Sequence, residues 1–267
     1  MKYAFLLCLL PFVGAADNIL YSTFPGVIPP NVLSEGFEAT STSELGALIG
    51  ASTGSGPHHL INATVLMSDW AKQSDWVGVG TTVNGVAGYY APLTLNLYQV
   101  AAMDAVGSLI ASVTTNAFVP FRPEKSAACA DDAWLSGTSC YHGIAFTVGF
   151  DLTGITVPGE FIYGLALNTT NYGYHPTGVA GPYDSLNFGA TSDPPSVGFN
   201  PRPDNEYWNT TWSAEYADGG AGGLGTFRNS GFTGETPIIS FDETPEPGTL
   251  ALFAGALTAL GFFRRKR

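Results

Sequence analysis

Leu93-Thr-Leu-Asn-Leu-Tyr98 alternates apolar and polar side chains over most of its length. This period of two is typical of a β-strand with one face in a hydrophobic core. Leu60–Met67 is mostly apolar and predicts a second strand. Ser108–Val113 follows the first stretch after a loop that contains Asp104 and Gly107. The first and third segments are therefore predicted to pair as a hairpin.

Further short strands follow along the chain. Ile144–Phe150 leads toward Ile155–Val157, and the chain returns as Glu160–Leu167. Between them, Pro158-Gly159 predicts a type II turn, because proline fixes φ and glycine accepts a positive φ. Shorter strands are predicted at Ser185–Phe188, Tyr207–Trp212, Gly225–Phe227 and Ile238–Phe241.

About nine short strands without βαβ alternation predict an all-β fold, as a single β-sandwich or jelly-roll-like domain. One helical signal competes at Ser41-Thr-Ser-Glu44, which has the form of a capping box. Gly46 and Gly50 interrupt the helical pattern that follows. We therefore interpret this segment as a loop or an edge strand.

The composition of the 267-residue chain also favours a turn-rich domain. Charged residues make up 12%, aromatic residues 13%, and there are 33 glycines and 18 prolines. These values exclude an intrinsically disordered chain and argue against a coiled coil. The net charge is −12. Between Asp17 and Glu246, five cations stand against all 22 acids, a net charge of −17. That charge argues against a nucleic-acid partner.

The first residues, 1–16, predict a secretory signal peptide. Lys2 gives a basic start, Tyr3–Val13 is an apolar run, and Ala15 and Ala16 are small residues at the expected cleavage position. The run is too short to cross about 30 Å of hydrocarbon as a helix. We expect signal peptidase to cleave after Ala15 or Ala16, and an N-terminal anchor is the alternative.

The last residues, 244–267, have three parts in order. The triplet Pro245-Glu246-Pro247 is followed by the uncharged run Thr249–Phe263. As a helix this run rises about 22 Å, a marginal membrane span. A basic terminus then orients the helix with its end in the cytoplasm and the body outside. The four cations of this terminus are Arg264, Arg265, Lys266 and Arg267.

This tripartite tail resembles the PEP-CTERM sorting signal of Gram-negative bacteria that make exopolysaccharide. The resemblance implies recognition in the inner membrane by an exosortase, cleavage near the triplet, and delivery to the cell surface or extracellular matrix. The inner membrane is then a transient partner, contacted through the C-terminal helix. A plain single-span anchor is the alternative.

Two cysteines, Cys129 and Cys140, remain once the signal peptide with Cys8 is removed. An isolated pair in an exported protein is most simply a disulfide. Closing this loop removes about 3 kcal/mol of unfolded-chain entropy. The alternative is a metal site with His142, which lacks a visible fourth ligand.

Several stretches of the body carry a second resemblance. They are Phe37–Gly46, Val119–Pro123, Ile162–Ala166, Tyr183–Asn187, Gly219–Arg228 and the loop between Cys129 and Cys140. Together they are similar to a group of uncharacterised secreted bacterial β-sandwich proteins. This resemblance is spread over most of Phe37–Arg228, within the domain predicted at 17–243, and it implies fold and export rather than an activity.

The sequence contains no recognisable catalytic motif. The sequence lacks the signatures of serine hydrolases, zinc proteases and phosphate-binding loops. His58-His59 lies in a Gly/Ser/Pro loop without a neighbouring acidic ligand. We expect no catalytic residue, no metal site and no cofactor, with Ca²⁺ as an ion that acidic turns could hold. The acids available for a glycoside hydrolase pair are Asp131, Asp132, Asp204, Glu206 and Glu215.

Trp208-Asn-Thr-Thr-Trp212 places two indoles on one face of a predicted strand, about 13 Å apart. Aromatic rings at this spacing are candidates for stacking on sugars, and Tyr172 and Tyr174 could extend the platform. The alternative is that these rings fill the core of the sandwich.

These observations predict an exported, exosortase-processed surface or matrix protein that is not an enzyme and that associates with exopolysaccharide. A carbohydrate-binding module for that polysaccharide is the first alternative. An exported glycoside hydrolase with two acids is the second.

Overall fold

The computed structural model describes residues 18–36, 44–52, 54, 56–75, 80–167, 186–203, 206–209, 227–229 and 234–244, with the backbone alone at 208–209 and 227–229. Ile19–Glu243 forms one compact unit. The predicted signal peptide and the tail from Pro245 onward lie outside the described residues. The predicted domain boundaries therefore stay predictions.

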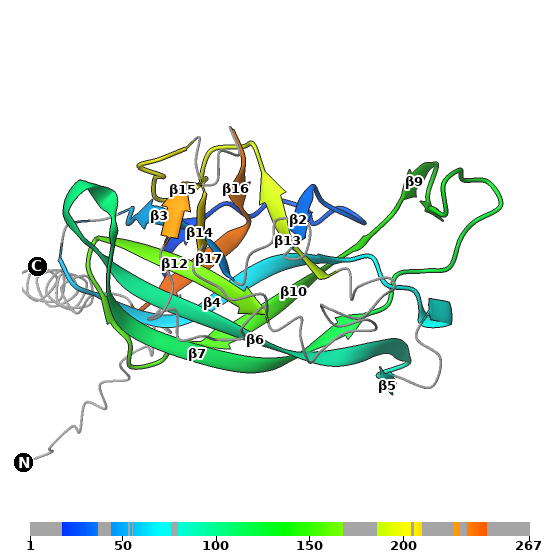
Figure 1. The fold of residues 1–267 in the computed structure, drawn as a ribbon, viewed down its shortest axis with the longest axis horizontal. Helices are drawn as coiled ribbons and strands as arrows, with labels where there is room; N and C mark the ends of the chain where they lie inside the picture. Colours follow the sequence, from blue (N-terminus) through cyan, green and yellow to red (C-terminus); the bar gives the residue numbers. More distant parts are fainter. Residues whose placement is uncertain are drawn as a thin grey trace, which may run out of the picture. The chain divides into compact units, whose positions relative to one another are not determined.

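The body is an all-β sandwich of two antiparallel sheets (Figure 1). Eight strands of the described residues form the first sheet. These are β1 (Asn18–Ser22), β2 (Ser34–Gly36), β4 (His58–Asp69), β10 (Ile144–Asp151), β11 (Thr156–Val157), β13 (Leu186–Thr191), β16 (Thr236–Pro237) and β17 (Ile239–Glu243).

Seven strands of the described residues form the second sheet. These are β3 (Glu44–Gly50), β5 (Thr81–Val83), β6 (Val86–Val100), β7 (Val106–Pro120), β12 (Glu160–Leu167), β14 (Tyr207–Asn209) and β15 (Phe227–Asn229). A separate hairpin pairs β8 (Trp134–Ser136) with β9 (Ser139–Tyr141). Two 3₁₀ turns, η1 (Gln73–Asp75) and η2 (Ala102–Asp104), complete the described elements.

β4 is the long central strand of the first sheet. β10 pairs with it from Asp69 to Asn62, and β17 pairs with it from Val65 to Leu60. Because β10 and β17 both pair with Val65, they lie on opposite edges of β4. The last strand of the body is thus held inside the sheet by β4.

β6 and β7 form the hairpin that the alternating segment predicts, side by side in Figure 1. Both strands have 15 residues, more than predicted. Along β6, Leu93, Leu95 and Leu97 are fully buried in the core. The alternation therefore places every second residue of this strand between the sheets.

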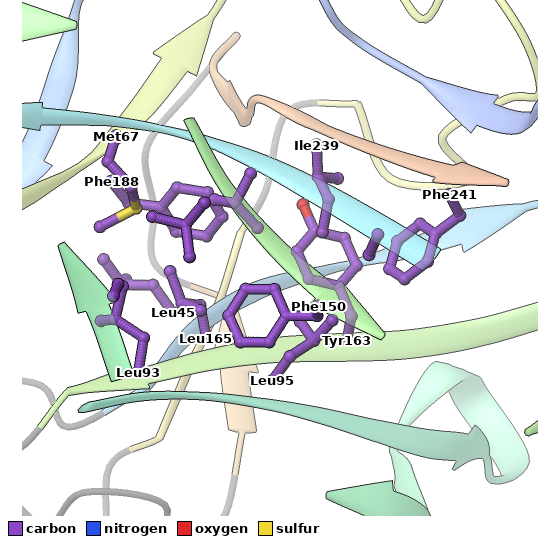
Figure 2. Packing of buried hydrophobic residues seen from close by; sticks show 14 of the residues in the cluster. Leu45, Met67, Leu93, Leu95, Phe150, Tyr163, Leu165, Phe188, Ile239 and Phe241 are labelled. Carbon is purple, nitrogen blue, oxygen red and sulfur yellow. The ribbon is translucent and has the colours of Figure 1, made fainter. Parts of the chain in front are cut away.

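The core lies between the two sheets, and aromatic rings connect them. Phe241 of β17 packs edge-to-face against Phe161 and Tyr163 of β12, with ring centroids 5.2 and 5.6 Å apart. Figure 2 shows Phe241 and Ile239 facing Tyr163 and Leu95 across this layer. Burial of large side chains from both sheets is the main stabilising term of such a fold.

The structure corrects two local predictions. From Glu44 onward the segment is neither a loop nor an edge strand, because β3 lies inside the second sheet between β14 and β12. Pro158-Gly159 does not make the predicted type II turn, since Gly159 has no positive φ. β11 pairs with β4 in the first sheet and β12 enters the second sheet. The prolyl-glycyl pair therefore carries the chain from one sheet to the other.

Candidate functional site

The last strand of the body ends at a buried contact with the first residue of β4. His58 Nδ1 lies 2.7 Å from Glu243 Oε2, and the two side chains are 2% and 6% exposed. The imidazole N–H donates to the carboxylate, which makes this a charge-assisted hydrogen bond. Nε2 of His58 is also buried and has no hydrogen-bond partner. The ring is therefore held through Glu243 alone.

A β-bulge turns His58 toward Glu243. β17 pairs with β4 one residue at a time until Glu243, which pairs with Leu60 and skips Ile61. Side chains alternate between the two faces of a strand, so one extra residue changes the face of everything beyond it. Leu60 and Ala63 are three residues apart and both belong to the core. The bulge thus buries His58 on the side where Glu243 ends its strand.

A second buried cluster joins the two sheets. Glu35 of β2 lies opposite the core residue Phe188, and Glu206 directly precedes β14. Glu35 is 6% exposed and Glu206 is 1% exposed. Neither oxygen of Glu35 has a hydrogen bond within the geometric limits among the described residues. The carboxyl groups of Glu206 and Glu235 are the neighbours that affect its pKa. The hydroxyl of Tyr163 is buried without a hydrogen-bond partner. Beside the burial itself, the nearby Tyr21 and Glu206 raise its pKa.

Burial governs the electrostatics of this cluster. It raises the pKa of the Glu35 carboxyl, which the contact with Glu206 lowers and the nearby Glu235 carboxylate raises again. Burial also raises the pKa of the Tyr163 hydroxyl well above its usual value. Two adjacent buried carboxylates resist ionising together, so the pair favours holding a proton. A polysaccharide cannot reach these two acids, because both are buried.

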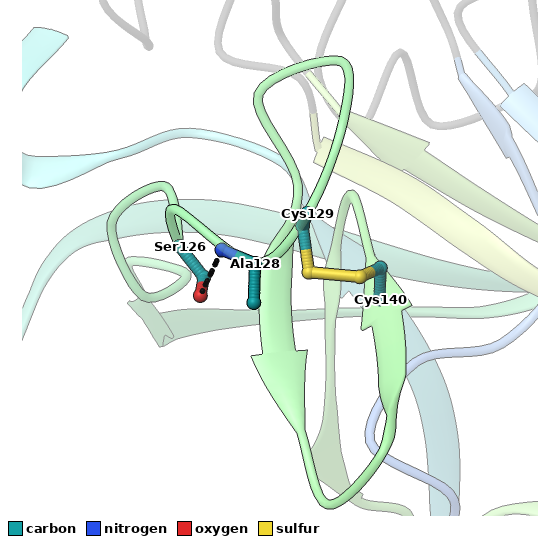
Figure 3. The surroundings of a disulfide bond; sticks show 4 residues. All are labelled: Ser126, Ala128, Cys129 and Cys140. Atoms are coloured by element: carbon teal, nitrogen blue, oxygen red, sulfur yellow. Dashed lines mark hydrogen bonds between the residues drawn. A yellow bond between two sulfur atoms is a disulfide. The ribbon is translucent and has the colours of Figure 1, made fainter.

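The structure joins Cys129 and Cys140 as the sequence predicts, with Cα atoms 5.8 Å apart (Figure 3). The bridge ties the loop before β8 to β9. Beside it, the Ala128 N–H donates to Ser126 Oγ at 3.2 Å. Trp134 Nε1 donates to the carbonyl of Gly143 at 2.8 Å. The disulfide hairpin, Ser126–Gly143, is thus closed both covalently and by hydrogen bonds.

Two cations attach this hairpin to the sandwich. Asp132 Oδ2 accepts from Lys72 Nζ at 2.8 Å and from Arg122 Nη2 at 2.7 Å. The hydrogen bond from Lys72, together with that from Arg122, lowers the pKa of the Asp132 carboxyl. Arg122 is buried, and its Nε donates to the carbonyl of Trp70 at 2.8 Å. Asp132, a candidate hydrolase acid, is therefore engaged in ion pairs.

Most sequence-predicted site residues lie outside the described part of the chain. Trp208 lies in β14, where its backbone pairs with Leu45 and Arg228, and its side chain is not described. The stacking platform, the hydrolase acids Asp204 and Glu215, and the processing sites therefore stay predictions. The remaining undescribed site residues are Ala15, Ala16, Tyr172, Tyr174, Trp212, Pro245, Glu246, Pro247, Arg264, Arg265, Lys266 and Arg267.

His58-His59 needs a correction. The pair opens β4 instead of lying in a loop, and His58 has an acidic partner 185 residues away in sequence. His59 is exposed, and its Nδ1 lies 3.0 Å from Thr156 Oγ1. Within the described ranges, no group of three His, Cys, Asp or Glu side chains is arranged to hold a metal ion.

Sequence reasoning missed four buried acids, Glu35, Glu44, Asp69 and Glu243. Glu243 follows Phe241 by two residues in β17, so strand alternation places both on the buried face. This spacing could have predicted from the sequence that Glu243 is buried and therefore pairs with a hydrogen-bond donor. Glu35 lies in a three-residue strand with no comparable pattern.

The described residues contain no helix long and apolar enough to cross a membrane, and Thr249–Phe263 lies outside them. No curated protein and no solved structure matches the chain. A family model for the PEP-CTERM protein-sorting motif matches residues 243–267. This match begins at Glu243, the last residue of β17. Directly after its β-sandwich body, the chain therefore carries the PEP-CTERM sorting motif of an exported, exosortase-processed protein destined for the cell surface.

Proposed function

We propose that the chain is a non-enzymatic surface or extracellular-matrix protein of a Gram-negative bacterium, and that its body associates with exopolysaccharide. The observation that carries this proposal is the sorting motif at 243–267, joined without a linker to the last strand of the body. Signal peptidase and exosortase act on the chain in turn, and the inner membrane holds it only between these two steps.

The environments of two of the five candidate acids, Glu206 and Asp132, support a non-enzymatic role. A glycoside hydrolase needs two carboxyl groups that flank the scissile bond in an accessible site. Glu206 is buried against Glu35, and Asp132 binds two cations. Glu206 is therefore closed to a sugar chain, and the Asp132 carboxylate is held by two cations.

Intact mass of the protein from its native host tests the processing. Membrane and medium fractions are measured separately. We expect the loss of about 16 N-terminal residues, as signal peptides predict, and of the tail after the triplet. A mass that still includes Thr249–Arg267 in the membrane fraction would replace the proposal with a simple anchored protein.

Association with exopolysaccharide is proposed to use the indoles of Trp208 and Trp212. The extended backbone of β14 supports the strand spacing on which this pair depends, although Thr210–Trp212 lies beyond the described strand. Affinity electrophoresis in gels that contain the host's polysaccharide tests it. The double variant Trp208→Ala/Trp212→Ala should abolish retardation. The control Trp70→Ala removes a half-exposed indole directly after β4 and should leave retardation unchanged. Equal retardation of all three proteins would exclude the platform.

We also propose that the body needs no cofactor. Thermal unfolding of the purified protein should not respond to Ca²⁺ or EDTA at millimolar concentration. A rise in Tm with Ca²⁺ would instead identify a cation site in the acidic body.

A further inference from the structure

β7 lies at an edge of the second sheet. β6 pairs with β7, and over the stretch Leu93–Tyr98 it also pairs with β12. Since both partners pair with this stretch, β7 and β12 lie on opposite sides of β6, and the far edge of β7 is an edge of the sheet. Among the described strands, none pairs with that edge, although β10 of the first sheet packs nearby. Figure 1 shows β7 along the lower rim of the body.

The other strands at the sheet edges are short or covered. β5, β15 and β16 end the strand order of the two sheets and have two or three residues each. In β1, the Ser22 N–H donates to the carbonyl of Val197 at 3.0 Å. In β10, the Ala145 N–H donates to the carbonyl of Pro30 at 2.9 Å. Short length and covering keep an edge from pairing with another chain. β7 has 15 residues, and no backbone hydrogen bond within the described ranges covers its far edge.

The register shows which backbone groups of β7 point away from β6. The Phe121 N–H donates to the carbonyl of Ala87, so these two residues face one another across the ladder. Facing alternates along a strand, and the register continues unbroken from there to Ala111. The odd-numbered residues of β7 from Ala111 to Val119 therefore bond to β6. The N–H and C=O groups that point to the far edge belong to Ser112, Thr114, Asn116 and Phe118.

The side chains along this edge are exposed and partly held in place. Ser112, Thr114 and Asn116 are exposed. Ser112 Oγ donates to Oδ1 of the buried Asn96 at 2.7 Å, and Thr114 Oγ1 lies 2.8 Å from Oγ1 of the buried Thr94. A segment that is fixed in advance loses less conformational freedom when it binds. β7 thus presents a preformed, extended edge.

β7 carries no charge, although the body is acidic. Between Asp75 and Arg122, Asp104 is the only charged residue, whereas the part between Asp17 and Glu246 has a net charge of −17. Charged side chains on an edge strand normally prevent pairing between chains. Two copies of an acidic body repel one another, so contact between them is favoured at a surface free of charges.

We propose that the far edge of β7 is a homodimer site, at which a second copy of the chain adds its own β7 antiparallel and joins the second sheets of both copies edge to edge. This site goes beyond the proposed function, because it needs neither the sorting motif nor polysaccharide. A two-fold axis perpendicular to the sheet keeps the core sides of both copies on one face. With Thr115 on that axis, Ser112 faces Phe118 of the second copy, and Thr114 faces Asn116 of the second copy. All four outward residues then exchange hydrogen bonds, and the pairing closes as a dimer instead of continuing as a fibre.

Disulfide trapping tests this register. Thr115 would lie opposite Thr115 of the second copy in a non-hydrogen-bonded pair, at a Cα spacing of about 4.5 Å that a disulfide accepts. Thr115→Cys protein from the native host should run as a disulfide-linked dimer on a non-reducing gel and as a monomer after reduction. Thr147→Cys, at an exposed position of β10, is the matched control and should run as a monomer, like wild type. No dimer from Thr115→Cys, or an equal dimer fraction from Thr147→Cys, would overturn the proposal.

Charge at the edge distinguishes self-pairing from any other contact. Thr114→Glu and Thr114→Lys each place two like charges diagonally across the axis. Sedimentation equilibrium of the full-length protein in density-matched detergent should show a monomer–dimer equilibrium for wild type and a dimer Kd raised about fivefold in both variants. An equal mixture of the two variants should dimerise at least as tightly as wild type, because opposite charges then face one another.

Thr147→Glu and Thr147→Lys on β10 are the matched controls and should dimerise like wild type, and circular dichroism checks that each variant is folded. A contact between β7 and a different surface of the acidic body would be weakened by glutamate and strengthened by lysine. Such opposite responses, an unchanged Kd in both Thr114 variants, or a wild type that stays monomeric would each overturn the proposal.

Discussion

At the scale of single residues, several polar side-chain atoms are buried in the sandwich without a hydrogen-bond partner. Both oxygens of Glu35, the hydroxyl of Tyr163 and Nε2 of His58 are buried without a hydrogen-bond partner. Each such group costs about 1–3 kcal/mol relative to a paired one. Glu35 is the most sensitive, because the side chain that it contacts is another carboxyl.

We expect Glu35→Gln to stabilise the body at neutral and alkaline pH. Burial raises the pKa of Glu35 above its ordinary value of 4.5. The folded state then keeps a proton that the unfolded state releases, so the contribution of Glu35 to stability is fully present below about pH 4.5 and is lost as pH rises through the raised pKa. Glutamine has no charge to lose, and its amide can donate to Glu206. The free energy of unfolding at pH 8 should rise by about 1–2 kcal/mol.

Urea unfolding of the purified protein from pH 4 to 9 measures this change. Glu160→Gln, an exposed glutamate of β12, is the control and should follow wild type. Burial also raises the pKa of Asp69. Asp69 is unchanged in wild type, Glu35→Gln and Glu160→Gln, so it affects all three unfolding curves equally. The difference between the curves therefore belongs to Glu35. A difference that does not grow with pH would contradict the shared-proton pair.

Gly46 is a residue where no side chain fits. A Cβ at this position would collide with the backbone carbonyl of Tyr163 on the neighbouring strand. Backbone cannot move aside as a flexible side chain can, so Gly46→Ala should lower the free energy of unfolding by about 3 kcal/mol. Gly149 of β10 has nothing within 4 Å of the same position. Gly149→Ala should match or exceed wild type in thermal unfolding, and equal losses in both variants would refute the steric explanation.

At the scale of elements, the disulfide hairpin should contribute a measurable part of the stability. Replacing Cys129 and Cys140 with alanine opens a loop with a sequence separation of 11 residues. The expected loss is about 3 kcal/mol in the free energy of unfolding. Denaturant unfolding without reductant compares the variant with wild type, and the same experiment with reductant should bring wild type to the variant's value. An unchanged midpoint would mean that the hairpin opens independently of the sandwich.

Local patterns predicted the elements whose partners are near in sequence. The alternation in Leu93–Tyr98 and the short loop after Val100 specify a hairpin, because both strands and their turn lie within one stretch. The same reasoning failed for β3, where Gly46 and Gly50 indicate an interrupted helix or an edge. Those glycines instead permit close contact between β3 and its neighbours, which only the assembled sheet reveals.

The candidate site was predictable to the same degree. Cys129 and Cys140 are only 11 residues apart in sequence. In an exported protein, two such cysteines are most simply joined in a disulfide. His58 and Glu243 are 185 residues apart, and their contact depends on a bulge in β4 that no local pattern announces. Sequence reasoning recognised the sorting tail, but it could not show that the tail begins inside a paired strand.

At the scale of the whole molecule, charge is distributed unevenly along the chain. The part between Asp17 and Glu246 has a net charge of −17, and the last four residues are all cations. Anionic lipid on the cytoplasmic face repels the first and attracts the second. In the proposed processing, this uneven charge would keep the acidic body away from the cytoplasmic face and the basic terminus on it.

Changing Arg264, Arg265, Lys266 and Arg267 together to glutamine should therefore prevent processing. Each cation near an anionic membrane surface contributes about 1 kcal/mol, so the four together contribute about 4 kcal/mol to holding an uncharged run that is too short to anchor firmly. Without them, we expect the run to slip across the membrane and the mature fraction to fall at least about tenfold. Intact mass of secreted and membrane-bound protein measures the outcome, and Lys125→Gln, an exposed cation of the body, is the control. Normal shortening of the glutamine variant would show that exosortase recognises the triplet and the apolar run without the charge that orients them.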